Sequence, residues 1–232
     1  MKKKSESLEK KININFKNKR LLDQSLAHRS YLNEHPEFKL GSNERLEFLG
    51  DAVLEFISSL LLFKKLPNHP EGDLTNIRSC LVRTSTLAEI AKGLDLGSYL
   101  LLSKGEEDLG GRENQSLLAN SIEALIGALF LDQGMDIAQK FVLKLIRPKL
   151  SEVIKAKKFK DPKSLFQEAI QAKKKITPQY EVVEESGPDH NKTFTVALLI
   201  EDKLQAKGKG KSKQEAEESA AKAALEKLEN KS

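Results

Sequence analysis

The chain has 232 residues, of which 39% are apolar, and it carries 39 Lys and Arg against 34 Asp and Glu, a formal net charge of +5. No apolar run is long enough to cross a bilayer, and the basic N-terminus lacks the apolar core of a signal peptide. A single cysteine, Cys80, excludes an intrachain disulfide. We therefore expect a cytoplasmic protein, with no membrane partner and with one substantial core beside a smaller one.

The positive charge is not gathered in one region. Residues 1–154 carry 22 basic and 21 acidic side chains, residues 155–160 carry four lysines and no acid, and residues 161–232 carry 13 of each. A nucleic-acid-binding surface would need local segregation of charge, so motifs must indicate the function.

The first part of the chain, from residue 8 to about 150, has apolar residues at helical spacing throughout. The stretch 151–164 then loses this periodicity, gains lysines and ends in Asp161-Pro162, which is typical of a helix start. We predict an all-helical domain over residues 1–155, whose first ten residues form a basic tail, and a lysine-rich linker over residues 156–160.

The segment 161–232 has a different pattern. A helix from Ser164 to Lys174 precedes QYEVVEES and KTFTVALLI, which alternate in polarity, then DKLQAKGKG and an Ala-rich helix from about Ser212. Gly187-Pro188 with Asp189 predicts the turn between the first two strands. The predicted order, α-β-β-β-α, describes a small α+β domain.

The segment NERLEFLGDAVLEFISSLLLF, residues 43–63, predicts a helix capped by Asn43. Glu44, Glu47 and Asp51 stand at i, i+3 and i+7, so their carboxylates share one stripe of this helix. Apolar residues fill much of the remaining surface: Leu46, Leu49, Val53 and Ile57 opposite the stripe, and Phe48, Leu54 and Phe56 between.

Acids at helical spacing usually form a solvated face of an amphipathic helix. Here the apolar surroundings favour a groove between helices instead. Clustered carboxylates repel one another and are costly to desolvate, so such a cluster usually indicates a bound cation.

A second apolar helix, over residues 116–134, carries Asn120 and Glu123 at i and i+3, with Gly127 one turn later. Gly127 and Gly50 would let neighbouring helices approach closely near these polar groups, although plain helix packing explains the glycines equally well. Carboxylate and amide oxygens suit Mg²⁺ or Mn²⁺, ions that catalyse phosphodiester hydrolysis.

These residues lie within motifs that resemble a known family. NERLEFLGDAVL closely resembles the ribonuclease III signature, and LAHRS, EGDLTNIRSCLV and KGEEDLGGRENQSLLANSIEALIGALFLDQG resemble the family's other conserved blocks, together covering nearly all of residues 10–150. The resemblance implies a double-stranded-RNA-specific endoribonuclease that uses Mg²⁺, or Mn²⁺ as a substitute, and leaves 5′-phosphate and 3′-hydroxyl ends. It also implies a homodimer with one active site for each strand, and a role in processing ribosomal RNA precursors and messenger RNA.

Position by position, the resemblance implies that Glu47, Asn120 and Glu123 are direct metal ligands. Asp51 would act through water or a second ion, and Glu47, Asp51 and Glu123 would be the catalytic acids. The family usually has aspartate where this chain has Asn120, which still offers a carbonyl oxygen but one negative charge fewer. The alternative is therefore a weakened or inactive nuclease that only binds double-stranded RNA.

Three further residues of this part have less specific roles. Glu44 and Glu71 match acidic positions that support the site or contact RNA. Glu44 could instead simply favour a helix N-terminus, and Glu71 could be a loop residue beside a helix cap. His28 is interpreted as a structural residue.

Residues 161–229 resemble a double-stranded-RNA-binding domain, which reads the shape of A-form RNA. The resemblance implies three contact regions, on the first helix, in the first turn and at the start of the last helix. They are Gln167 and Glu168; Gly187, Pro188, Asp189 and His190; and Lys211, Lys213 and Gln214.

The last of these regions is also physically sensible, because a helix N-terminus and two ammonium groups attract phosphate. Alone, KGKGKSK would be interpreted as a solvated basic turn. Its place between three predicted strands and an Ala-rich helix favours a phosphate contact. Gln214 replaces a commonly basic position, so that contact should be somewhat weaker.

Overall fold

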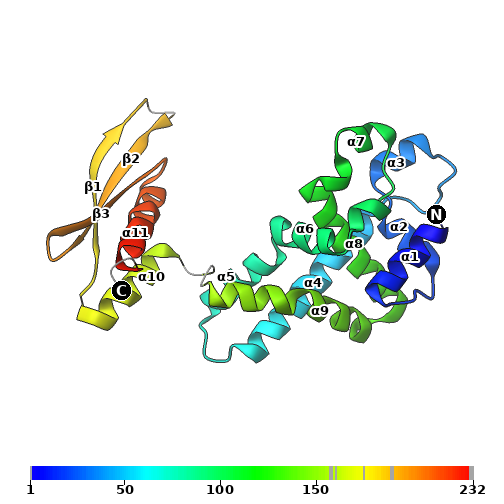
Figure 1. Cartoon of the computed structure of the whole chain (residues 1–232), viewed down its shortest axis with the longest axis horizontal. Coiled ribbons are helices and arrows are strands. Elements are labelled where there is room, and N and C mark those ends of the chain that lie inside the picture. Colours follow the sequence, from blue (N-terminus) through cyan, green and yellow to red (C-terminus); the bar gives the residue numbers. More distant parts are fainter. Residues whose placement is uncertain (1, 157–158, 160, 175, 189–190, 230–232) are drawn as a thin grey trace. The chain divides into compact units, whose positions relative to one another are not determined.

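The computed structural model describes residues 2–156, 159, 161–174, 176–188 and 191–229. The chain divides into two compact units, Met1–Phe159 and Lys160–Ser232, and each has an apolar core of its own (Figure 1). Most of the predicted linker, at positions 157, 158 and 160, lies outside the described residues.

The first unit is helical, as predicted, but the prediction that its first ten residues form a basic tail is wrong, because Lys2–Ile12 form a helix and Leu8 is buried in the core. Two single 3-10 turns, Leu96–Tyr99 and Gly111–Glu113, accompany nine α-helices in the described part of this unit. The helices are α1 (Lys2–Ile12), α2 (Lys19–Ser25), α3 (Arg29–Glu34), α4 (Glu44–Lys65), α5 (Glu71–Val82), α6 (Thr84–Gly93), α7 (Lys104–Asp108), α8 (Gln115–Gln133) and α9 (Met135–Lys155). Within the described ranges, none of them combines the length and the apolar character that a membrane crossing requires.

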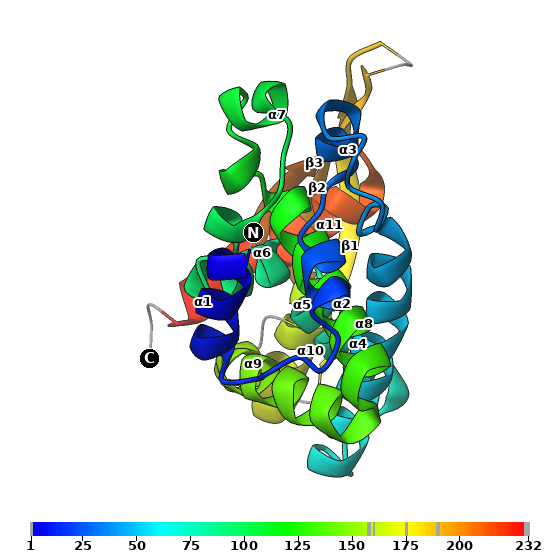
Figure 2. The same cartoon turned by 90° about the vertical axis from the view of Figure 1, so that its right-hand side faces the viewer.

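Helix α8 lies at the centre of this unit and packs against α2, α4, α6 and α9 (Figure 2). Ten of its 19 residues are buried, which explains why its sequence is apolar on nearly all sides. The Asn114 side chain caps the helix by accepting hydrogen bonds from the backbone N–H groups of Ser116 and Leu117, at 2.9 and 3.2 Å.

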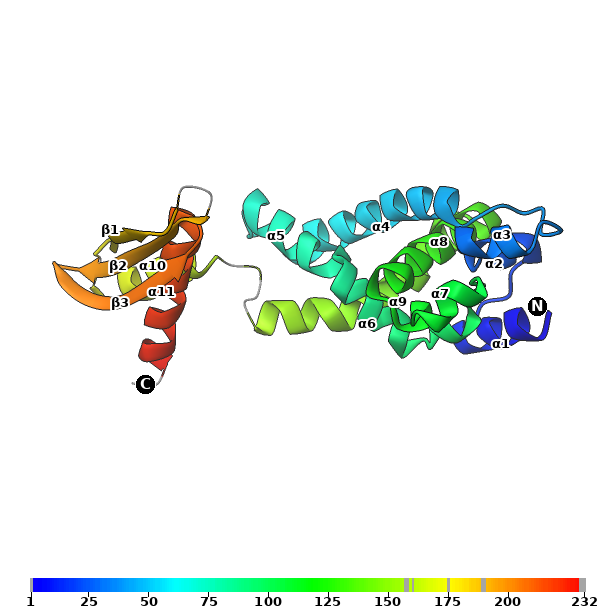
Figure 3. The ribbon, with the colours of Figure 1, turned by 90° about the horizontal axis from the view of Figure 1, so that it is seen from above.

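Helices α4 and α8 touch through their backbones (Figure 3). A methyl group added at Gly50 would overlap the carbonyl oxygen of Glu123, and one added at Gly127 would overlap that of Leu46. Both glycines therefore serve a close helix approach, and no residue with a side chain fits at either position without displacing a helix.

The burial along α4 agrees with part of the predicted pattern. Leu54 and the predicted core residues Leu46, Val53 and Ile57 are buried. The apolar surface predicted around the acids is only partly buried between helices, because Phe48 is 82% exposed and Phe56 is 56% exposed. Both rings are largely open to solvent within this unit.

The predicted cap of α4 is also wrong in detail. Asn43 does occupy the N-cap position, but its backbone is helical and its side chain makes no capping hydrogen bond. It is buried, and its backbone N–H donates to the Ala27 carbonyl oxygen at 2.8 Å. The start of α4 is thus held by the preceding segment rather than by an asparagine cap.

His28 has a structural place. Its side chain accepts a hydrogen bond from the Ser30 backbone N–H and so caps α3. Ser30 Oγ in turn accepts from the Ser103 backbone N–H at 3.1 Å, and the His28 N–H donates to the Leu101 carbonyl oxygen. The LAHRS motif therefore joins two segments far apart in the sequence.

Helix α9 runs to Lys155, beyond the point where the apolar periodicity was expected to end. Leu150 and Val153 are buried in the core of the first unit and keep the last turns helical. Helix α9 therefore ends at the residue where the helical domain was predicted to end, four residues after the sequence begins to lose its apolar periodicity.

The second unit has the predicted α-β-β-β-α order. Helix α10 (Pro162–Lys174) starts at the predicted proline, and β1 (Gln179–Ser186), β2 (Thr193–Ile200) and β3 (Lys203–Gly210) form an antiparallel sheet in that order. Helix α11 (Lys213–Glu229) packs on β2 and β3 and against α10. At Gly208, α11 comes so close to β3 that a methyl group would overlap its backbone.

We predict that Gly127→Ala lowers the free energy of unfolding of the first unit by about 2 kcal/mol or more, because the methyl group meets a backbone carbonyl that cannot move alone. The control is Gly93→Ala, at the end of α6, where nothing lies within 4 Å of the added carbon. It should be neutral or raise stability by up to about 1 kcal/mol. Denaturant unfolding of both variants checks this, and equal effects would contradict the close packing.

Candidate functional site

The helix contact at Gly50 and Gly127 determines which polar side chains meet. Glu47 and Asp51 lie on α4, on either side of Gly50 in the sequence. Asn120 and Glu123 lie on α8, and the Glu123 backbone is the group that Gly50 touches. The structure therefore brings these four residues together in one acidic cluster.

Within this cluster, Glu123 has the most strongly raised pKa. It is half-buried, and burial, followed by the negative charges of Asp51 and Glu47, raises its pKa from 4.5 to about 7. Near neutral pH, Glu123 is thus poised between its charged and neutral forms when the cluster holds no cation.

Glu47 is affected in the same direction. Burial raises its pKa, as do the charges of Glu44 and Asp51, whereas a hydrogen bond from the Asn120 side chain lowers it. An ionised carboxylate only accepts hydrogen bonds, so Asn120 must donate its amide N–H to Glu47. An aspartate at position 120 could not do so while ionised.

The cluster offers three carboxylates and one amide oxygen, which are ligands that a hard divalent cation prefers. Without a cation, the three carboxylates repel one another. Among the residues that the structure describes, no three His, Cys, Asp or Glu side chains are already drawn into a group that could hold a metal ion. Closing the cluster around a cation therefore requires side-chain movement, which the partly exposed positions of these groups allow.

The two supporting acids are placed differently. Glu44, the first residue of α4, accepts a hydrogen bond from Ser42 Oγ at 2.8 Å and lies 3.9 Å from Arg29 Nη1. Its charge acts on Glu47, so it belongs to the edge of the acidic cluster.

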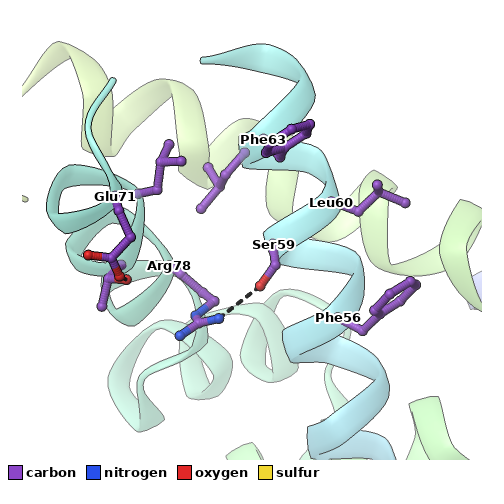
Figure 4. A pocket seen from close by; sticks show the side chains of 9 residues that line it. Phe56, Ser59, Leu60, Phe63, Glu71 and Arg78 are labelled. Atoms are coloured by element: carbon purple, nitrogen blue, oxygen red, sulfur yellow. Dashed lines mark hydrogen bonds between the residues drawn. The ribbon is translucent and has the colours of Figure 1, made fainter. Parts of the chain in front are cut away.

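Glu71 begins α5 and lies in a separate pocket of about 400 Å³ between α4 and α5 (Figure 4). Its carboxylate accepts a hydrogen bond from Thr75 Oγ1 at 2.9 Å. Deeper in the pocket, Arg78 Nη1 donates to Ser59 Oγ at 2.9 Å. The structure therefore does not bring Glu71 into the cluster of the same chain.

The sequence interpretation missed an exposed aromatic row on α4. Phe48, Phe56 and Phe63 are 82%, 56% and 74% exposed. Phe56 and Phe63 line the pocket that holds Glu71, and Phe48 borders another of about 630 Å³, near Leu131. The signal was present, since intervals of eight and seven residues place all three on one side of a helix.

In the second unit, Gln167 and Glu168 are exposed on α10. Gly187 has a φ of +97°, which fits the predicted turn, and Pro188 is exposed. The predicted contacts Asp189 and His190 lie outside the described residues.

The third predicted region surrounds the start of α11, where Lys211, Lys213 and Gln214 are exposed. Ser212 Oγ accepts from the Glu215 N–H at 3.1 Å, and Glu215 Oε2 accepts from the Lys211 N–H at 2.7 Å. These two bonds hold the first turn of α11 and resemble a capping box, except that Glu215 accepts from Lys211, one residue before Ser212.

Comparison with known proteins gives consistent results for both units. Residues 18–150 match the family described as Ribonuclease-III-like, and residues 162–228 match the double-stranded RNA binding motif. The chain is 45% identical over 231 residues to Ribonuclease 3 of Roseiflexus sp., covering 99% of this chain and 98% of that protein. It is 47% identical over 224 residues to Ribonuclease 3 of Carboxydothermus hydrogenoformans, covering 97% and 95%.

A solved structure is also similar. The nuclease domain of ribonuclease III from Campylobacter jejuni superposes with a TM-score of 0.57 at 42% identity, covering 61% of this chain and 94% of that domain. With relatives of this identity over nearly the whole chain, the chain belongs to the ribonuclease III family and is an endoribonuclease specific for double-stranded RNA.

Proposed function

We propose that the chain hydrolyses phosphodiester bonds in both strands of duplex RNA at the acidic cluster of α4 and α8, with a divalent cation, leaving 5′-phosphate and 3′-hydroxyl ends. The observation that carries this proposal is the backbone contact at Gly50 and Gly127, which gathers oxygen side chains from two helices. Clustered carboxylates that are costly to desolvate are a recurrent feature of sites that bind hard cations.

In this proposal Glu47, Asn120 and Glu123 hold the cation, and Asp51 acts from the exposed side of the cluster through water or a second ion. Mg²⁺ is the proposed cation and Mn²⁺ a substitute, because both accept carboxylate and amide oxygens. The chemistry that such a cation supplies when bound is activation of water and stabilisation of the charge that develops on the phosphate oxygens.

The chain's own residues have three tasks. The crowded carboxylates bind and orient the cation, and the rigid helix crossing fixes their positions. The hydrogen bond from Asn120 lowers the pKa of Glu47 and so opposes part of the rise that burial and the neighbouring charges cause, which favours the ionised form that a cation binds. Glu44 would support this cluster from its edge, and Glu71 would contact RNA or support the chemistry from the pocket beside α5.

The second unit supplies affinity for the duplex. The exposed groups of α10, of the turn at Gly187-Pro188 and of the start of α11 would contact successive grooves of A-form RNA. The lysines would bind phosphates without reading the bases.

We also propose that the nuclease unit acts as a homodimer, with one site for each strand. The solved nuclease domain from Campylobacter jejuni has a region involved in dimer formation. In this chain, Phe48 and Phe63 are mostly exposed on α4, beside pockets of about 630 and 400 Å³. Exposed apolar patches of this kind are typical of protein interfaces.

The proposed setting is the cytoplasm, where the chain would process ribosomal RNA precursors and messenger RNA. The RNAs concerned can be identified by sequencing 5′ ends in cells with and without the gene. Ends that persist unchanged after deletion would contradict this role.

A matched pair of variants tests the charge of the cluster. Without metal, stability should fall as the pH rises from 4.5 to about 7, because the folded state then loses the proton that its raised pKa favours. Glu123→Gln removes this effect and should raise the free energy of unfolding in EDTA at pH 8 by about 1–2 kcal/mol, after discounting for solvent screening. At pH 4.5 it should change little. Asn120→Asp adds a charge and should destabilise at pH 8.

Cleavage of long duplex RNA against Mg²⁺ concentration gives the second measurement. Glu123→Gln should lose most activity, whereas Asn120→Asp should lower the Mg²⁺ needed for half-maximal cleavage by roughly fivefold. An unchanged Mg²⁺ requirement would mean that Asn120 is not a ligand. A parent that is inactive at every Mg²⁺ concentration but rescued by Asn120→Asp would establish the alternative, a duplex-RNA-binding protein with a weakened site.

The proposed phosphate contacts of the second unit are tested by the double variant Lys211→Ala with Lys213→Ala. The double variant should bind every duplex about tenfold more weakly at moderate salt, and the slope of log K against log salt should flatten by about one for each lost contact. The control, Lys203→Ala with Lys207→Ala, removes two exposed lysines of β3 and should change less. A changed sequence preference with an unchanged salt slope would contradict the assignment.

The proposed dimer is tested by Phe48→Glu, which places a charge in the exposed aromatic row. Sedimentation velocity should show the parent at twice the chain mass and the variant shifted to the monomer, because burying an unpaired carboxylate is costly. The control is Leu109→Glu, at a residue that is 87% exposed on the turn after α7. A monomeric parent, or equal effects of both substitutions, would refute this interface.

A further inference from the structure

The proposed phosphate-binding lysines already have partners inside the second unit. Lys213 Nζ lies 3.6 Å from Glu185 Oε1, and Lys211 Nζ donates to Asn191 Oδ1 at 3.0 Å. Both partners belong to the hairpin of β1 and β2, so the start of α11 is tied to the hairpin whose turn is another proposed contact region.

The sheet register explains why Glu185 reaches Lys213. Glu185 on β1 pairs with Phe194 on β2, which pairs with Gly210 on β3, so the three share one row across the sheet. Buried Leu198 and Ile200 have the same parity as Phe194, so this row faces the helices. The row lies at the end of the sheet, because Gly210 is the last residue of β3. Helix α11 begins three residues later, at Lys213, so its first turn lies beside this row and Lys213 reaches Glu185.

Lys213 is held from two sides at this end of the sheet. Its ammonium group lies 5.8 Å from the centre of the Phe194 ring as well as beside the Glu185 carboxylate. Its side chain remains 61% exposed, and that of Glu185 is 45% exposed. A phosphate can therefore reach the ammonium group, but the nearby Glu185 carboxylate already attracts the same charge.

We propose that Glu185 competes with RNA phosphate for Lys213 and thereby lowers the affinity of the second unit for duplex RNA. The inference rests on the proposed phosphate contact of Lys213. A carboxylate and a phosphate are both anions that the same ammonium group attracts, so the presence of one weakens the hold of the lysine on the other. When the duplex binds, Lys213 turns from Glu185 to a phosphate, and the free energy of the lost ion pair is subtracted from that of RNA binding.

The size of the effect follows from the exposure of the pair. Ion pairs at this level of exposure contribute little, so removing the competitor should tighten binding by about two- to fivefold rather than by orders of magnitude. The gain should shrink as salt rises, because the ion pair between Glu185 and Lys213 is screened.

A double-mutant cycle in the full chain tests this proposal. The affinity for one duplex is measured in EDTA, which prevents cleavage, for the parent, Glu185→Gln, Lys213→Ala and the double variant. Glu185→Gln should lower Kd about two- to fivefold in the parent and by less than about 1.5-fold when Lys213 is alanine. The control is Glu181→Gln, which makes the same charge change in the row of Ala197, on the other face of β1, and should leave Kd nearly unchanged.

The possible outcomes separate the two claims. An equal gain from Glu185→Gln in both backgrounds would mean that Glu185 acts only through general charge, and no gain in the parent would mean that it does not compete. Either result overturns the inference while the lysine contact stands. If Lys213→Ala alone left Kd unchanged, the proposed phosphate contact itself would be wrong, and the competition with it.

Discussion

The nuclease unit depends on one contact, the direct approach of the α4 and α8 backbones at Gly50 and Gly127. Glycine is required at both positions because a methyl group on either would overlap a carbonyl oxygen of the other helix. The same contact places Glu47 beside Asn120 and puts Glu123 opposite α4. Packing and the proposed chemistry therefore depend on the same contact, and a change that separates the helices also separates the oxygen-bearing side chains of the acidic cluster.

The cluster that this contact creates is unfavourable by itself. Burial and neighbouring charges oppose ionisation of Glu123, and the fold tolerates this because the surrounding apolar core is large. Asn120 reduces the strain on Glu47 by donating a hydrogen bond in place of a further charge. The second unit has the opposite arrangement, in which Lys213 and Glu185 attract each other. In the proposed mechanism, a cation relieves the first site and a phosphate replaces the partner in the second.

The sequence predicted the helices, the strand order and the stripe of acids, because periodicity and turn residues determine local structure directly. The spacing of Phe48 and Phe56 places them on one side of α4, but it could not predict that this side is exposed, since an apolar residue on a helix has the same sequence pattern whether it faces a core or a second molecule. Asn43 was expected to cap α4, yet contacts with a distant segment hold that position instead. The pairing of Glu185 with Lys213 depends on strand register, which no short sequence motif encodes.

The packing of α11 on the sheet has a consequence for the second unit as a whole. Its described core contains eight buried residues, and four of them are the alanines Ala206, Ala220, Ala221 and Ala224. Together with Gly208, these small residues let α11 lie close to the sheet. An alanine side chain removes little apolar area from water, so this core contributes less hydrophobic stabilisation than one of the same number of leucines. A ligand that binds only the folded form adds to stability by an amount that grows with the logarithm of its concentration relative to its Kd. By this linkage, any duplex RNA that binds only the folded unit also raises the free energy of unfolding of this small core.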